Sequence, residues 1–129
     1  MYGIYVCYNE KVTGNFEEAI EKANREYLIW RHPAPIRRKL KYPTKIIIKI
    51  SGEDRYYKGD LLLVSGYGVF NAKIFYEDLD HRPAIWKSAP EKDWKSVLII
   101  SNLQQVLDPV EVYRMHPPQG VRYIEFKNL

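Results

Sequence analysis

The chain contains one cysteine, Cys7, among its 129 residues. A single cysteine cannot form an internal disulfide, and it also excludes a zinc site built from several cysteines. Cysteine usage this low is typical of a reducing compartment, so we expect a cytoplasmic protein. Because Cys7 stands among apolar residues of a predicted strand, packing is its expected role, ahead of a reactive thiol.

Long apolar runs are also absent. No stretch approaches the roughly 20 apolar residues that a membrane-spanning helix needs. The segment from Met1 to Tyr8 lacks the basic flank and the long apolar stretch of a secretory signal. The length suffices for one core. We therefore expect residues 1–129 to form a single domain that does not contact a membrane.

Catalytic motifs are missing as well. The three histidines are not part of a His-x-Glu motif, and there is no Cys-x-x-Cys, so neither a zinc deaminase nor a metalloprotease is expected. A Gly-x-Ser-x-Gly motif is absent. The acidic run formed by Glu77, Asp78 and Asp80 fits a solvated loop better than a cation site. We expect a protein that is not an enzyme and that binds no metal and no cofactor.

Basic residues, in contrast, are concentrated in one part of the chain. The formal net charge is +4, and the stretch from residue 31 to residue 49 contains no acid. Its basic residues are Arg31, Arg37, Arg38, Lys39, Lys41, Lys45 and Lys49. Such a block attracts a polyanion, and charge alone favours nucleic acid only slightly over an ordinary solvated surface.

Short strands dominate the predicted secondary structure. Alternating or β-branched stretches predict strands over 1–8, 27–31, 44–50, 61–64, 69–76, 96–101 and 121–126. Asn15 and Glu18 resemble a capping box, and apolar residues at helical spacing predict one helix over 16–26. We expect turns at 51–54, at Lys58-Gly59-Asp60 and at 65–68, and a polar loop over 77–90.

This order of elements favours an α+β fold. Six or seven short strands with several apparent hairpins, and one main helix near the N-terminus, argue against a parallel α/β sheet. We expect a small, partly closed β-barrel with the helix against one side.

The three tryptophans stand in unusual settings. Trp30 ends a predicted strand just before a proline-rich stretch, while Trp86 and Trp94 lie in a polar, lysine-flanked region. Each is either a core or lid residue, or a wall of an aromatic cage for a ligand. Local context does not choose between these roles for Trp86 and Trp94, and it favours the core for Trp30.

Several of these segments resemble one superfamily. The stretch 27–30, ending in Trp30, is similar to the segment that carries the first cage tryptophan of YTH domains. The stretches 85–87 and 93–97 resemble the segment with the other two. The stretch 59–72 resembles the Gly-Asp turn, strand and hairpin of EVE and other PUA-like domains. The likeness covers most of the chain in element order.

The resemblance implies a PUA-like fold in which Trp30, Trp86 and Trp94 enclose a flipped-out, modified base. In YTH domains the base is N6-methyladenine in RNA. EVE domains, and related modules at the front of McrB-type restriction enzymes, read modified bases in DNA. The chain accordingly resembles a methylated-base reader, fused to or associated with a larger restriction or RNA-processing protein. The choice between RNA and DNA stays open.

The basic residues then become candidates for holding phosphates beside such a cage. They are Arg31, Arg37, Arg38, Lys39 and Lys41, with Lys87 and Lys95 as a second rim. Asn9 is the candidate for bonding the base edge, although its context favours a simple turn residue. Two alternatives remain: a PUA-like RNA-binding module without preference for modification, and a small enzyme or protein-interaction domain.

Overall fold

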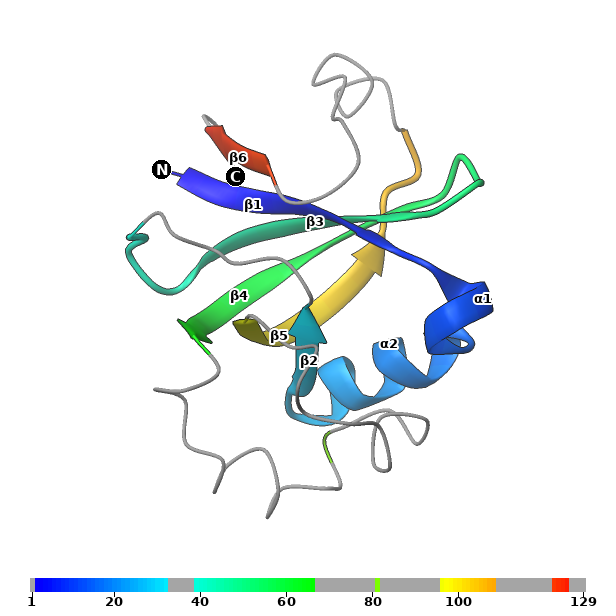
Figure 1. Ribbon diagram of the computed structural model, residues 1–129, viewed down its shortest axis with the longest axis horizontal. Coiled ribbons are helices and arrows are strands. Elements are labelled where there is room, and N and C mark those ends of the chain that lie inside the picture. Colours follow the sequence, from blue (N-terminus) through cyan, green and yellow to red (C-terminus); the bar gives the residue numbers. More distant parts are fainter. Residues whose placement is uncertain (1, 33–38, 67–80, 82–95, 109–121, 126–129) are drawn as a thin grey trace.

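The computed structural model describes residues 2–32, 39–66, 81, 96–108 and 122–125. Within these ranges the chain forms six strands, one main helix and one short helix (Figure 1). In chain order the elements are β1 (Tyr2–Tyr8), α1 (Glu10–Thr13), α2 (Phe16–Arg25), β2 (Leu28–His32), β3 (Thr44–Ile50), β4 (Tyr56–Gly66), β5 (Ser96–Gln105) and β6 (Arg122–Glu125). The predicted α+β class and the main helix near the N-terminus are confirmed.

The strands form one mixed sheet in the order β2-β5-β4-β3-β1-β6. β1 and β3 run parallel, from Ile4 opposite Ile46 to Tyr8 opposite Ile50, and the other four pairs are antiparallel. Strand direction rotates steadily across the sheet (Figure 1). Among the described residues β2 and β6 are its two edges and do not pair with each other, so the sheet is open. The closed side of the expected barrel therefore stays a prediction.

The main core lies between α2 and one face of the sheet. Alternate residues of β1 and β3 face it, because successive side chains of a strand point to opposite faces. Its buried members include Ile4, Val6 and Tyr8 of β1, Ile46, Ile48 and Ile50 of β3, and Phe16, Ala19 and Ala23 of α2. The small alanines allow the helix to approach the sheet closely. The periodicity that predicted the helix is thus the spacing of its buried face.

Two side chains fix the start of α2. The Oδ1 atom of Asn15 accepts a hydrogen bond from the Glu17 backbone N at 2.8 Å, as expected for a capping residue. Glu10 of α1 accepts a second bond from the Phe16 backbone N, at 2.9 Å. The carboxylate also faces the positive end of the helix dipole. Sequence reasoning identified Asn15 and missed Glu10, whose sequence separation from the helix start hides its role.

The predicted turn at Lys58-Gly59-Asp60 is wrong, because all three residues lie inside β4. Gly59 is required there for a different reason: strand β5 passes very close. A Cβ atom on Gly59 would lie 2.7 Å from Leu103 Cδ2 and 3.0 Å from the Ser101 carbonyl oxygen. The glycine therefore marks a close backbone approach rather than a change of direction.

Two irregularities in the β4–β5 ladder compensate each other. Between the pairs Lys58–Gln104 and Asp60–Ser101, strand β5 has one residue more than β4. The extra length falls at Asn102, whose φ of 56° is the left-handed conformation that asparagine tolerates. A few residues on, β4 has one residue more and the original register returns. The strand predicted over 96–101 therefore continues to Gln105, and both strands keep their faces.

The remaining predicted elements are partly confirmed, partly wrong and partly outside the described residues. The strand predicted over 44–50 coincides with β3, and β6 lies within the predicted strand at 121–126. Ser65 and Gly66, expected in a hairpin turn, belong to β4. The strand predicted over 69–76 lies outside the described residues. Neither helix within the described ranges is long and apolar enough to cross a bilayer.

Candidate nucleic-acid interface

Three strand termini meet at one end of the sheet. His32, which ends β2, pairs with Ser96, which begins β5, and Ser96 also pairs with Gly66, which ends β4. The basic segment of residues 33–43 leaves from β2 at this end. The tryptophan-containing stretch that precedes β5 arrives here. The sheet therefore brings the residue before the basic segment, His32, next to the residue after the tryptophan-containing stretch, Ser96.

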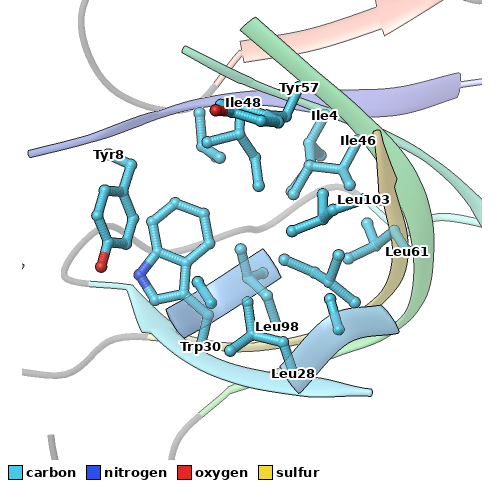
Figure 2. Close-up of a cluster of buried hydrophobic side chains, with 14 of the residues drawn as sticks. Ile4, Tyr8, Leu28, Trp30, Ile46, Ile48, Tyr57, Leu61, Leu98 and Leu103 are labelled. Atoms are coloured by element: carbon cyan, nitrogen blue, oxygen red, sulfur yellow. The ribbon is translucent and has the colours of Figure 1, made fainter. Parts of the chain in front are cut away.

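Trp30 lies on β2, two residues before His32, and faces the core. Trp30 is 4% exposed, and its ring centroid lies 5.4 Å from that of Tyr8. Figure 2 shows the indole at the edge of the cluster, with its nitrogen and the Tyr8 hydroxyl on the same side, away from Ile46 and Leu61. Trp30 is thus a core residue at the cluster's rim, which agrees with its sequence context.

Tyr8 connects Trp30 to the rest of an aromatic cluster. Its ring lies 4.7 Å from Phe16, and Phe16 lies 4.7 Å from Tyr57 in an edge-on arrangement. Burial raises the pKa of Tyr8, and the nearby carboxylates of Glu10 and Glu18 raise it further. The phenol therefore keeps its proton at any physiological pH. Tilted and edge-on ring pairs of this kind stabilise a fixed geometry.

Part of the basic segment is attached to the core. Leu40 is buried in the main core, while its neighbours Lys39 and Lys41 are exposed. Tyr42 also packs against the core and receives a hydrogen bond from the backbone of Val64 on β4. Because Leu40 is buried, the lysines on either side of it are held at the surface. The predicted phosphate-binding residues Lys39 and Lys41 are thus solvent-accessible.

Asn9 lies at the end of β1 and caps α1. Its Oδ1 atom accepts a hydrogen bond from the Lys11 backbone N at 3.0 Å, and its backbone is extended. The residue is exposed. This local capping role matches the turn interpretation that its sequence context favoured. Contact with a base edge remains a prediction for Asn9.

The other candidates fall outside the described part of the chain. They are Trp86, Trp94, Arg37, Arg38, Lys87 and Lys95. Arg31 belongs to β2 by its backbone, and its side chain is not described. Between residues 67 and 95 only His81 is described. Its ring stacks on Tyr27 with centroids 3.8 Å apart, and its Nε2 lies 3.1 Å from Glu26 Oε2.

The sequence analysis missed two clusters of charged side chains, and the first of them surrounds Asp60. Lys45 Nζ lies 2.6 Å from Asp60 Oδ1, and Asn102 Nδ2 donates to Asp60 Oδ2 at 2.8 Å. The hydrogen bonds from Lys45 and then Asn102 lower the pKa of Asp60. In the sequence, the cluster is indicated only by the lysines that alternate with isoleucines along β3. That pattern does not predict that Lys45 lies opposite Asp60 of β4.

A second cluster surrounds Arg55. Its guanidinium contacts the carboxylates of Glu10 and Glu53, donates to the Tyr57 hydroxyl at 3.2 Å, and lies over that ring. These contacts tie α1 to the β3–β4 hairpin. Across the ranges that are described, no group of histidine, cysteine and carboxylate side chains is placed to hold a metal ion.

No family model, curated protein or solved structure matches this chain. The described residues include a cluster of aromatic rings at the rim of the core, two exposed lysines on either side of the buried Leu40, and three strand ends side by side. The lysines provide exposed positive charge, which is one of the features that nucleic acids bind, while the aromatic rings among the described residues are buried in the core.

Proposed function

We propose that the chain is a PUA-like nucleic-acid-binding domain that receives a flipped-out, methylated base at the sheet end where β2, β4 and β5 meet. One observation supports this most strongly. Trp30, whose ring packs on Tyr8 of β1, lies on β2, the strand that leads directly into the basic segment, and Leu40 anchors the described part of that segment to the same core. One aromatic ring of the proposed pocket and the exposed Lys39 and Lys41, which would contact phosphates, are therefore attached to the same core.

In this proposal Trp30 forms the floor of the base pocket, and Trp86 and Trp94 form its walls. Trp94 precedes Ser96 by two residues, and Ser96 pairs with His32, which follows Trp30 by two residues. Trp30 and Trp94 are thus each two residues along the chain from the paired residues His32 and Ser96.

The energies are sufficient for a reader domain. Stacking a base on an aromatic side chain contributes about 1–3 kcal/mol. A buried methyl group adds about 0.8 kcal/mol. Extracting a base from a duplex costs a few kcal/mol, so single strands and distorted duplexes are the favoured targets. A snug pocket can convert one methyl group into roughly 10- to 200-fold selectivity. No catalytic group is needed for this activity.

The phosphate backbone would be held by the basic residues next to the pocket. In the proposal they are Arg31, Arg37, Arg38, Lys39, Lys41, Lys87 and Lys95. We further propose a cytoplasmic protein that acts with, or as part of, a larger restriction or RNA-processing protein.

The test is binding of matched single-stranded RNA and DNA oligonucleotides, with and without one N6-methyladenine, at fixed salt. We expect tighter binding of one methylated strand, and loss of that preference in Trp86→Ala and Trp94→Ala while weak general binding persists. Tyr2→Ala is the control, because Tyr2 is exposed on the β6 side of the sheet. Equal affinity for methylated and unmethylated strands in both nucleic acids would refute the methylated-base pocket.

The burial of Trp30 favours one alternative, an RNA-binding module without preference for modification. A tryptophan that is 4% exposed leaves little ring face for a base. This alternative predicts equal binding of methylated and unmethylated RNA with a steep salt dependence. A protein-interaction domain predicts no binding of either strand at modest salt.

A further inference from the structure

The face of the sheet opposite α2 carries a group of lysines that the proposed pocket does not use. Lys45, Ile47 and Lys49 alternate along β3 and point to this outer face. On β4, Tyr56, Lys58 and Asp60 point the same way, because Tyr57 between them faces the main core. The outer face therefore contains Lys45, Lys49 and Lys58, which we call the lysine triad.

Strand register brings the triad together. Lys58 lies directly opposite Ile47, while Lys45 faces Asp60 and Lys49 faces Tyr56. Lys58 is therefore the diagonal neighbour of both other lysines, at about 7–8 Å between α-carbons. Ile47 lies at the centre of the triad and is 3% exposed. Lysine stems cover apolar surface in this way while their ammonium groups reach water.

The positive charge of the triad is only partly neutralised. Asp60 binds Lys45 at 2.6 Å. In the described part of the chain, neither Lys49 nor Lys58 has a carboxylate within ion-pair distance, and both are partly exposed. The other acid near this face, Asp54, is hydrogen-bonded to Tyr56. Three cations against the carboxylates of Asp60 and Asp54 leave a net positive charge on this face, which a polyanion would neutralise.

This surface continues the basic segment. Lys41 precedes Lys45 by four residues, and β3 begins between them at Thr44. The Thr44 hydroxyl donates to the Tyr2 carbonyl oxygen at 2.6 Å, which anchors this start to β1. Lys39, Lys41 and the triad therefore lie in succession from the sheet end where β2, β4 and β5 meet toward the far end of β3.

We propose that the lysine triad is a backbone-binding track for single-stranded nucleic acid, along which the strand continues after its base enters the pocket. The proposal rests on the proposed function, since it extends the same bound strand. The triad contributes affinity through phosphate contacts and makes no contribution to choosing the base. An acidic protein partner is the competing occupant.

The test is the salt dependence of binding for unmodified oligo-dT and oligo-U strands, measured by fluorescence anisotropy over a range of KCl concentrations. Each phosphate neutralised on a single strand contributes about 0.7 to the slope of log affinity against log salt. Lys49→Gln with Lys58→Gln should therefore reduce the slope by about 1.4. The ratio of methylated to unmethylated affinity should not change.

The matched control is Lys11→Gln with Arg25→Gln, which removes the same charge from exposed positions on the helices. It should leave the slope nearly unchanged. An equal reduction by both double variants would overturn the track, because it would reflect net charge alone. Competition by poly-glutamate as strong as by oligo-dT of equal charge would also overturn it in favour of an acidic protein.

The two proposals fail in different ways. A wild-type protein that binds strands with no preference for methylation refutes the pocket and leaves the slope comparison decisive for the track. A normal preference with an unchanged slope in the triad variant refutes the track alone. A wild-type protein that binds no strand refutes both. Thermal melting of each variant confirms that differences in binding do not reflect unfolding.

Discussion

Replacing Trp30 tests its place in the core directly. The side chain is 4% exposed and packs on Tyr8 with ring centroids 5.4 Å apart. Truncating a buried aromatic side chain to alanine costs about 3–5 kcal/mol. A domain of this size has about 5–15 kcal/mol of stability, so Trp30→Ala should lose a large fraction of it.

A milder variant keeps the test informative if Trp30→Ala does not fold. Trp30→Phe retains an aromatic ring beside Tyr8 and removes a few buried atoms, so it should cost about 1–3 kcal/mol at roughly 0.8 kcal/mol per buried methylene. Urea unfolding, followed by far-ultraviolet circular dichroism, measures the free energy of unfolding of both Trp30 variants. This signal is suitable because it does not depend on tryptophan emission. The control is Tyr2→Ala at an exposed position, which should stay within about 0.5 kcal/mol of wild type. A loss below 1 kcal/mol for Trp30→Ala would refute the core placement.

Three further variants test other parts of the fold by the same unfolding measurement. Gly59→Ala places a Cβ atom 2.7 Å from Leu103 Cδ2 and should cost about 1–3 kcal/mol, and an unchanged midpoint would contradict the close approach. Asp60→Asn should destabilise near neutral pH, and the difference should shrink below about pH 4, because the lowered carboxyl pKa in the folded state means its contribution is lost on protonation. A difference independent of pH would exclude this ionic contribution. Glu10→Ala removes one of the two carboxylate partners of Arg55 and an acceptor for the first turn of α2, and should cost about 1–3 kcal/mol. An unchanged stability would show that this carboxylate does not hold α1 in place.

Local patterns predicted the elements whose side chains alternate regularly. The strand at 44–50 was predicted at its observed bounds because β-branched isoleucines alternate with lysines at its ends. The helix was recognisable because its buried residues recur at helical spacing and Asn15 precedes them. These signals depend on neighbours within one turn or one strand, so a single sequence contains them.

Features that depend on distant strands could not be predicted. Gly59 resembles a turn residue, yet its small size serves the close passage of Leu103. Asn102 appeared to end a strand, although it occupies a left-handed position inside one. The parallel pairing of β1 with β3 was equally hidden, because two helices and β2 intervene between them.

The site was predictable in part for the same reason. The exposed charge of Lys39 and Lys41 follows from composition, and the position of Trp30 on a strand follows from its neighbours. The face of β2 that Trp30 occupies depends on its packing against Tyr8 of β1, and two helices separate these strands in the chain. The lysine triad could be recognised only from the pairing of β3 with β4, which places Lys58 diagonally opposite Lys45 and Lys49.

Leu40 has a consequence for the thermodynamics of recognition. A flexible basic segment loses conformational entropy when it binds, and this loss lowers affinity. Burial of Leu40 has already restricted the chain around Lys39 and Lys41 before any ligand arrives. Leu40→Ser should weaken strand binding without changing the salt slope, because the same phosphates are neutralised. The unfavourable binding entropy measured by calorimetry should grow. A reduced slope would instead mean that Leu40 determines which phosphates are contacted.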